Sequence, residues 1–286
     1  MGFRRIVLAL AVLAVTGACA GSTDTPPPTT TASAVPTTDA SPEGAGGLSA
    51  DQRRRADQLI SAFENSTTEI SYDYAENLGD GRGVTAGRAG FTTATCDALA
   101  VIERYSETTP TNGLARFVTE LGRLCEAASD DTTKLPEADY MRAWAAAAKD
   151  PLFRKAQDEI VDREYFEPAM DLADTLDLRL ALSRAQLYDT AIQHGAGDDP
   201  DGLAAIAART TADVGTPAKA GERAWLDAFF DARIATLRDP DNAETAEAWR
   251  QSTDRVACMQ RIAAAGNYSL AAPLRFSVYG DDFVVE

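Results

Sequence analysis

The chain of 286 residues contains one histidine, His194, and four cysteines. A single histidine cannot build a histidine-rich metal site, and the cysteines do not have the spacing of a zinc finger. A Ser-His-Asp site would need His194 as its base, yet the sequence has no G-x-S-x-G motif to carry the serine. We therefore expect no metal and no cofactor, and we expect His194 to form hydrogen bonds inside the protein or to line the far wall of a cleft.

Two further absences concern nucleotides and nucleic acids. The glycine cluster at 79–87 lacks the G-x-x-x-x-G-K-[ST] sequence of a phosphate-binding loop and does not lie in a βαβ unit, which excludes a nucleotide site. Basic residues are also scarce, because 27 Lys and Arg stand against 44 Asp and Glu and the net charge is −17. This acidity argues against nucleic acid and favours a cationic partner, although it could equally serve only to keep a secreted protein soluble.

Long apolar runs are scarce as well. One run, at 6–15, follows Arg4 and Arg5 and is too short to span a membrane. This arrangement predicts a secretory signal over residues 1–20. The VTGAC sequence at 15–19 resembles a bacterial lipobox, which would give a lipid-anchored Cys19, while ACA at 18–20 also fits a cleavage site before Gly21. We favour the lipid anchor, because an unpaired cysteine otherwise has little reason to lie there.

The next segment, residues 21–47, is dominated by Thr, Pro, Ser, Ala and Gly and contains no aromatic residue. Such a segment cannot bury enough apolar surface to offset the entropy of ordering, so we predict a disordered linker. Residues 48–286 remain for one folded domain, which we expect to be a monomer. The protein is expected to be extracellular, either secreted or tethered to the outer face of the cell membrane.

The folded part begins with a helix that ends at a carboxylate. A capping box at 49–52 is followed by apolar residues at 56, 59, 60 and 63, which form one helix face. Glu64 lies beside this stripe at the edge of the core, where burial favours a protonated carboxyl. Residues 69–78 alternate like a short strand, and Asp80 follows in the glycine cluster, where solvent and backbone N–H groups keep it ionised. Two carboxylates in such different settings can act as acid and base in a cleft.

The rest of the domain is predicted to be mainly helical. Thr95 can cap a helix that packs beside a second helix near 114–125, which would bring Cys96 close to Cys125. We predict a disulfide between them, the alternative being two reduced thiols, and a buried free thiol at Cys258. Further helices are expected at 144–161, 165–176, 178–194, 200–211, 221–237 and 243–265, followed by an extended tail that packs back onto the body.

A series of motifs resembles one enzyme family. The series is ENST at 64–67, YDYAENLGDGRGVTAG at 72–87, GF at 90–91, Asp97, AAAKDPLFRKAQDEIVDREYFEPA at 146–169, YD at 188–189, HGAGDDP at 194–200, DAR at 231–233 and YGDDFVV at 279–285. In this order the motifs resemble the chitosanases of glycoside hydrolase family 46, over nearly all of residues 49–286. The resemblance implies a mainly α (α+β), two-lobed, lysozyme-like fold with a cleft between the lobes and a small antiparallel sheet in the minor lobe.

The resemblance also implies a reaction, the endo-hydrolysis of β-1,4-linked glucosamine polymers (chitosan) with inversion at the anomeric carbon. It makes Glu64 the general acid and Asp80 the general base, and it matches Thr85 to the residue that helps to place the nucleophilic water. Asp97 matches a residue that binds a substrate amino group, because a carboxylate paired with an ammonium distinguishes glucosamine from its uncharged N-acetyl form.

Other positions match the family along the cleft and behind it. The further substrate-binding matches are Ser66, Tyr74, Glu76 and Arg82, and the matches to a buried charge network that supports Glu64 are Asp189, Arg233 and Arg255. Two other functions remain open, a non-catalytic lipoprotein that binds chitosan oligomers and a lysozyme-like muramidase. The joint presence of Glu64 and Asp80 counts against the first, and repulsion between an acidic protein and an anionic cell wall disfavours the second.

Overall fold

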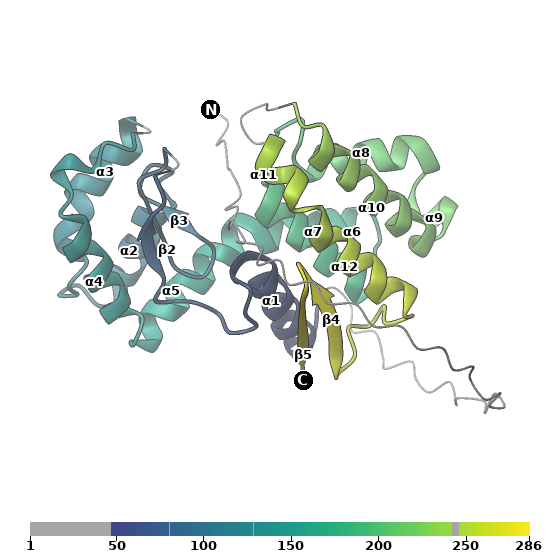
Figure 1. Cartoon of the computed structure of the whole chain (residues 1–286), viewed down its shortest axis with the longest axis horizontal. Coiled ribbons are helices and arrows are strands. Elements are labelled where there is room, and N and C mark those ends of the chain that lie inside the picture. Colours follow the sequence, from purple (N-terminus) through teal and green to yellow (C-terminus); the bar gives the residue numbers. More distant parts are fainter. Residues whose placement is uncertain (1–46, 80, 128, 242–245) are drawn as a thin grey trace, which may run out of the picture.

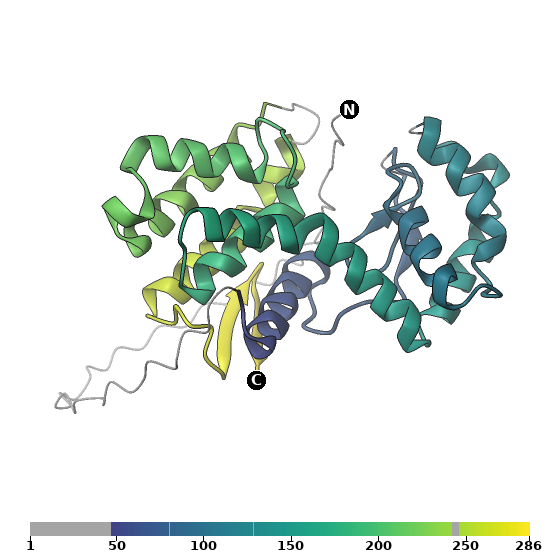
Figure 2. The ribbon, with the colours of Figure 1, turned by 180° about the vertical axis from the view of Figure 1, so that it is seen from behind.

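The computed structural model describes residues 47–79, 81–127, 129–241 and 246–286. The predicted signal, Cys19, the linker up to residue 46 and Asp80 lie outside the described residues, so the predictions made for them stay predictions. The described chain forms two lobes joined by a long helical segment (Figures 1 and 2). Among its helices, none has both the length and the apolar character needed to cross a membrane.

The minor lobe contains a three-stranded antiparallel sheet in the order β1-β2-β3. Its elements are β1 (Ala75–Asn77), β2 (Val84–Ala86), β3 (Phe91–Thr92), α2 (Asp97–Thr108), α3 (Val118–Ala127), α4 (Glu137–Ala147) and the 3₁₀ turns η1 (Ala115–Phe117) and η2 (Thr132–Lys134). All three residues of the middle strand β2 are buried. Thr85 lies opposite Glu76 on β1 and opposite Thr92 on β3, so this register fixes Thr85 at the centre of the sheet.

A continuous helical segment leads from the minor to the major lobe (Figure 2). It consists of α5 (Pro151–Val161), the π-helical turn η3 (Asp162–Phe166) and α6 (Glu167–Thr175). The major lobe adds α1 (Ala50–Asn65), α7 (Ala181–His194), α8 (Leu203–Val214), α9 (Pro217–Ala220), α10 (Glu222–Arg238), α11 (Ala246–Gln251), α12 (Thr253–Ala264), β4 (Leu274–Val278) and β5 (Asp281–Val285). Helix α1 contacts α7, β4 and β5, so the tail predicted to pack onto the body forms a hairpin against the helix that carries Glu64.

The sequence prediction for the first helix is confirmed. Ser49 Oγ accepts a hydrogen bond from the backbone N–H of Gln52, whose side chain accepts one from the backbone N–H of Ser49 at 2.9 Å. The predicted apolar face is buried, and the ring of Phe63 meets the ring of Phe276 on β4 at a centroid distance of 6.4 Å. Packing on one face holds α1 against the major lobe and aims its last turn at the space between the lobes.

The strand predicted at 69–78 is shorter than expected. Only Ala75–Asn77 pairs with β2, and the residues just before it form a turn and irregular chain. The carbonyl oxygen of Tyr72 accepts hydrogen bonds from Trp144 Nε1 and Gln157 Nε2, both at 3.0 Å. Side chains of α4 and α5 therefore satisfy this part of the backbone in place of a neighbouring strand, and alternation of residue types cannot reveal that.

Two predictions about helix ends are also corrected. The helix expected at 144–161 is broken, because Pro151 occupies the first position of α5, where a missing N–H is tolerated, and Asp150 caps it by accepting from the N–H of Leu152 at 2.9 Å. Thr95 does not cap α2. The N-cap residue is Cys96, in a left-handed conformation with φ 71°, and the predicted disulfide that joins it to Cys125 is confirmed.

The third described cysteine, Cys258, lies on α12 and is a buried free thiol, as predicted. Burial raises the pKa of this thiol to about 12, which keeps it protonated and unreactive. Its role is therefore packing in the major lobe.

Candidate active site

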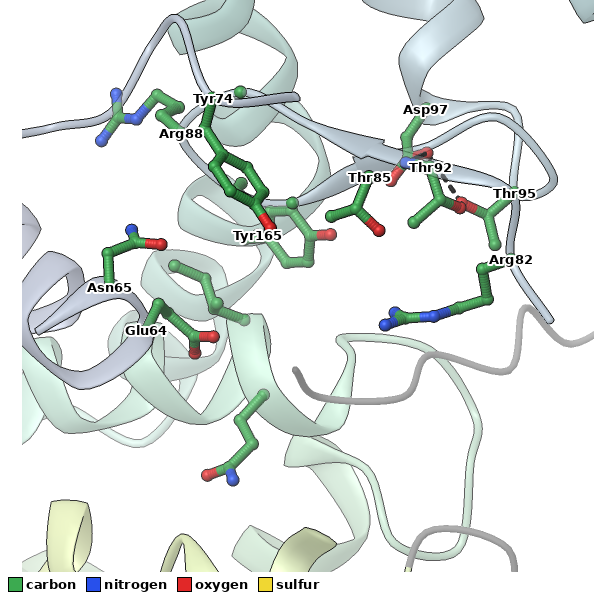
Figure 3. Close-up of a pocket in the computed structure, with 15 residues that line it drawn as sticks. Glu64, Asn65, Tyr74, Arg82, Thr85, Arg88, Thr92, Thr95, Asp97 and Tyr165 are labelled. Carbon is green, nitrogen blue, oxygen red and sulfur yellow. Dashed lines mark hydrogen bonds between the residues drawn. The ribbon is translucent and has the colours of Figure 1, made fainter. Parts of the chain in front are cut away.

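A pocket lies between the two lobes, and both contribute to it (Figure 3). Glu64 and Asn65 come from the end of α1, and Tyr165, Ile192 and Gln193 come from η3 and α7. The minor lobe contributes Tyr74, Arg82, Thr85, Gly87, Arg88, Ala89, Gly90, Thr92, Thr95 and Asp97. Five of the predicted site residues, Glu64, Tyr74, Arg82, Thr85 and Asp97, therefore meet in one place.

Glu64 is the carboxylate that the major lobe presents to this pocket. It lies in the last turn of α1, and Figure 3 shows its carboxylate pointing into the open space. Its side chain is 18% exposed, and Arg255 Nη1 donates a hydrogen bond to Glu64 Oε1 at 2.6 Å. The partly buried position at the edge of the core is the one that the helical spacing predicts. The arginine fixes the carboxylate in a single orientation while leaving one oxygen for a ligand.

Behind Glu64 lies a chain of buried ion pairs. Arg255 Nη2 on α12 donates to Asp189 Oδ1 on α7 at 2.5 Å, and Arg233 Nη1 on α10 donates to Asp189 Oδ2. The Asp189 side chain is fully buried. Burial opposes the ionisation of Asp189, but the two guanidinium groups outweigh it and hold the pKa of this carboxyl below its usual value. The structure thus brings together the three residues that match the supporting network, and Arg255 links them to Glu64.

His194 closes the far end of this chain. Arg233 Nε donates to His194 Nε2 at 3.3 Å, so the other ring nitrogen, Nδ1, carries the proton and donates it to the carbonyl oxygen of Asp201 at 2.9 Å. Burial and the neighbouring Arg233 lower the pKa of His194 well below its ordinary value, so the ring is neutral. The expectation that His194 forms hydrogen bonds inside the protein is confirmed.

Gln193 connects the network to the pocket. Arg233 Nη2 donates to Gln193 Oε1, and Gln193 Nε2 donates to Ser252 Oγ at 2.6 Å. Gln193 also lines the pocket beside Glu64. Gln193, which precedes His194 in the chain, therefore links the buried charge network to the pocket wall.

The opposite wall centres on Thr85. Its side chain is fully buried at the middle of the sheet, and its hydroxyl has no hydrogen-bond partner among the described residues. Figure 3 shows this hydroxyl pointing into the pocket, across from Glu64. A buried hydroxyl without a partner is costly unless water or a ligand completes it, so this group is available to bind one of them.

Asp97 is held rigidly beside Thr85, at the start of α2. Its Oδ1 accepts hydrogen bonds from the backbone N–H of Thr92 at 2.8 Å, from Thr95 Oγ1 at 2.7 Å and from the N–H of Ala98 at 2.9 Å. These donors and the helix N-terminus favour the charged carboxylate. Because the disulfide at Cys96 adjoins it, Asp97 is a fixed anion on the pocket wall, which suits the binding of an ammonium group.

The remaining predicted residues are placed differently. Tyr74 lines the pocket and donates its hydroxyl hydrogen to Glu76 Oε2 at 3.1 Å, while Glu76 itself is exposed on β1 and is not among the lining residues. Ser66 is the exposed C-cap of α1, in a left-handed conformation with φ 53°, and it also lies outside the lining. Arg82 reaches into the pocket (Figure 3). Asp80 lies outside the described residues.

Several lining residues were missed by sequence reasoning. Tyr165 enters the pocket from the π-helical turn, and such turns often occur at functional sites but have no sequence signature. Asn65 adjoins Glu64, and Arg88 lies directly after the quoted glycine-rich motif. The signal that could have identified Arg88 was its position, because it is a basic residue between two pocket motifs in an acidic chain. No group of three or more potential metal ligands occurs among the residues described.

Comparison with known proteins decides the family. Residues 58–274 match the profile described as glycosyl hydrolase family 46. The chain belongs to this family. A chitosanase of Bacillus subtilis (strain 168) is 48% identical over 246 residues, which are 85% of this chain and 88% of that protein.

Solved family structures agree with the fold. A mutant chitosanase of Bacillus subtilis MY002 complexed with 6 GlcN has a TM-score of 0.78 at 46% identity, covering 84% of this chain and 100% of that one. A Gynuella sunshinyii family 46 chitosanase complexed with chitotetraose has a TM-score of 0.78 at 47% identity, covering 84% and 99%. The predicted mainly α, two-lobed, lysozyme-like fold with its small antiparallel sheet is confirmed. So is the prediction of an enzyme, since the family is one of glycosyl hydrolases.

Proposed function

We propose that this enzyme cleaves chitosan internally, with Glu64 as the general acid and Asp80 as the general base of an inverting reaction. The observation that carries the proposal is the Glu64 carboxylate, which faces the pocket between the lobes and is held by Arg255. Chitosanases with 46–48% identity, two of them complexed with glucosamine oligomers or chitotetraose, support chitosan as the substrate. No cofactor or metal is needed, because two carboxyl groups suffice for this chemistry.

In the proposed reaction Glu64 protonates the glycosidic oxygen of the leaving sugar. When the proton has left, Arg255 at 2.6 Å stabilises the carboxylate that remains. Asp80 takes a proton from a water molecule that attacks the opposite face of the sugar ring. The buried hydroxyl of Thr85, which has no hydrogen-bond partner within the described part of the chain, lines the pocket and can hold this water.

Substrate selection is assigned to Asp97 on the minor-lobe wall of the pocket. Asp97 is fixed by three hydrogen bonds and can pair with the ammonium group of a glucosamine unit, whereas an N-acetyl group offers no charge. Tyr74 and Arg82 line the same pocket, Ser66 follows the lining residue Asn65 in sequence, and Glu76 accepts a hydrogen bond from Tyr74. We assign Arg82 to orienting nearby carboxylates, because a cation does not attract a polycation.

The decisive experiment is proton NMR of the anomeric signals during digestion of a fully deacetylated glucosamine oligomer. The α-anomer is expected first, and initial β-anomer would overturn the assignment of Asp80 as a base. Replacement of Glu64 by Gln should lower kcat by about 10²–10⁴-fold while oligomer binding persists. Glu69→Gln is the matched control, because Glu69 is an exposed glutamate a few residues further on. Uncut chitosan would favour a chitosan-binding lipoprotein, and cleavage of peptidoglycan would favour a muramidase.

For the organisation of the chain we propose a signal at 1–20, a linker at 21–47 and a monomeric catalytic domain at 48–286. We also propose that Cys19 is lipidated, which would tether the enzyme outside the cell. Replacement of Cys19 by Ala in the exporting host should then release the enzyme from the membrane fraction into the medium. Equal release of the unchanged protein would show cleavage before Gly21 instead.

A further inference from the structure

A second set of buried charges links the two lobes beside the pocket. Arg88 lies in the turn after β2, in the minor lobe, and its side chain is 7% exposed. Arg88 Nη2 pairs with Asp57 Oδ1 on α1 at 2.9 Å, and Arg88 Nη1 pairs with Asp158 Oδ1 on α5. The guanidinium of one minor-lobe residue thus connects the helix of Glu64 with the helix that bridges the lobes.

Each partner of Arg88 is itself held in place. Asp57 Oδ1 also accepts from the hydroxyl of Tyr188 at 2.9 Å, and Asp57 Oδ2 accepts from Arg53 Nε at 3.0 Å. Asp158 Oδ1 accepts from the hydroxyl of Tyr72 at 2.9 Å. These further hydrogen bonds leave the two carboxylates little freedom. The guanidinium group of Arg88 can therefore pair with both of them in only one relative position of α1 and α5.

The backbone of Arg88 is fixed as well. Its N–H donates to Gln157 Oε1 on α5 at 3.1 Å. The preceding residue, Gly87, has φ +72°, and a β-carbon there would lie 2.4 Å from the same Gln157 oxygen. The turn that follows Thr85 is therefore packed directly onto the bridging helix.

The position of this cluster connects it with the proposed reaction. Asp57 and Glu64 are seven residues apart on α1, which places them on one helix face two turns apart. Thr85 precedes Arg88 by three residues. A small cavity behind the pocket is lined by Asp57, Glu64 and Arg88 together. Figure 3 shows the guanidinium of Arg88 pointing away from the open part of the pocket, so it does not face a bound sugar.

We propose that Arg88 is a positioning residue, which sets the separation between the Glu64 wall and the Thr85 wall of the cleft. The inference rests on the proposed function. An inverting reaction needs a fixed gap for one water molecule between acid and base, and a misplacement of about 1 Å can cost 10²-fold in rate. Only a guanidinium reaches two carboxylates at once in a rigid geometry, so lysine cannot replace it fully.

A purely structural role is the competing explanation, because buried ion pairs also occur without any influence on a site. The chain offers a matched control for it. Arg184 on α7 is 3% exposed and pairs with Asp174 on α6, inside the major lobe and away from the pocket. Replacement of Arg184 by Met removes an equally buried guanidinium from a carboxylate without touching the link between the lobes.

The test compares Arg88→Met and Arg184→Met in the full protein, at a temperature well below the midpoint of unfolding of both. Both variants should unfold at lower temperature than the unchanged protein. Only Arg88→Met should lose kcat on chitosan, by about 10²-fold with KM changed less than threefold. Arg88→Lys should recover part of the loss. Equal kcat losses in the two Met variants, or a kcat of Arg88→Met within threefold of the unchanged protein, would overturn the proposal.

Asp57→Asn tests the same contact from α1, and it should also lower kcat with KM changed less than threefold, even if Arg88→Met does not fold. Where both variants fold, the double variant Arg88→Met/Asp57→Asn should lose no more kcat than the worse single variant, because the two residues act through one contact. Multiplying losses would show independent roles and contradict the proposal.

A distance measurement separates this inference from the proposed function. Spin labels are attached at cysteines replacing Arg142 on α4 and Arg179 before α7, whose side chains are 71% and 53% exposed. Arg88→Met should broaden the distribution of distances between the lobes, and Arg184→Met should not. An unchanged distribution would refute the link, whether or not the protein cuts chitosan. Absence of cleavage by the unchanged protein would instead refute only the proposed function.

Discussion

The neutral histidine at the end of the charge network makes a sharp prediction about acid stability. His194 is the only histidine of the chain, it is buried, and it accepts a hydrogen bond from Arg233. Because its pKa is lowered, His194 in the folded protein stays neutral at a pH at which the histidine of the unfolded chain takes up a proton. The stability that follows from this is present above the ordinary pKa of 6.5 and is lost as the pH falls towards the folded pKa.

The magnitude follows from proton linkage. A histidine of ordinary pKa in the unfolded chain binds about a quarter of a proton at pH 7 and almost a whole proton at pH 5. With about 1.4 kcal/mol per pH unit per proton, the free energy of unfolding should fall by about 2 kcal/mol between pH 7 and pH 5 while the folded histidine stays neutral. Asp189 contributes with the same sign but at lower pH, because its ordinary pKa is 3.8. The two effects are therefore separated on the pH axis.

Urea unfolding followed by circular dichroism at half-unit steps of pH measures this change. His194→Gln is the control, since an amide can still accept from Arg233 and donate to the carbonyl oxygen of Asp201. The variant should be less stable at pH 7 but should lack the loss between pH 7 and pH 5. The single imidazole signal in proton NMR should also stay unshifted over this range in the folded protein. Parallel stability curves for the two proteins, or a titrating imidazole near pH 6.5, would refute the reasoning.

Three further predictions concern the minor lobe. Replacement of Thr85 by Val should lower kcat about tenfold and leave the free energy of unfolding within about 1 kcal/mol, because the buried hydroxyl has no hydrogen-bond partner to lose among the described residues. An unchanged kcat would show that Thr85 does not hold the water. Asp97→Asn should lower kcat/KM about 10–100-fold on fully deacetylated chitosan and less on a half-acetylated polymer; equal losses on both would contradict charge recognition. Replacement of Cys96 and Cys125 by Ser should lower the free energy of unfolding in urea by about 3–4 kcal/mol, because the disulfide closes a loop with a sequence separation of 29 residues. A loss below about 1 kcal/mol would show that local packing alone stabilises this region.

The parts of the fold that were predicted correctly depend on local chemistry. Helix α1 has sixteen residues, and the capping box at Ser49 and the apolar spacing up to Phe63 specify it from local sequence alone. The same local pattern places Glu64 in its last turn. The Cys96–Cys125 pairing followed from two helices joined by a short connection. The position of the site came from the order of motifs, which periodicity alone could not have supplied.

The parts that were wrong depend on contacts distant in sequence. Tyr72 lies in a segment with strand alternation, but its carbonyl is bound by Trp144 and Gln157, more than seventy residues further on. Thr95 has a good capping side chain, yet its hydroxyl donates to Asp97, and the disulfide holds Cys96 in the capping position. Local propensity is a weak prior, and in both places the tertiary contact decides the backbone.

Contacts distant in sequence also explain how an acidic enzyme can keep cations close to Glu64, its proposed catalytic acid. In the proposed function a polycationic substrate is attracted by exposed negative charge, while Glu64 needs a cation behind it once its proton has left. The chain Glu64–Arg255–Asp189–Arg233 contains two carboxylates and two guanidinium groups, so it can supply that cation without presenting a net positive charge to the pocket. A proton on His194 would leave one positive charge uncompensated at the buried end of this chain. The balance therefore requires a neutral histidine, and the predicted pH dependence of unfolding tests the charge arrangement behind Glu64 as well as the histidine itself.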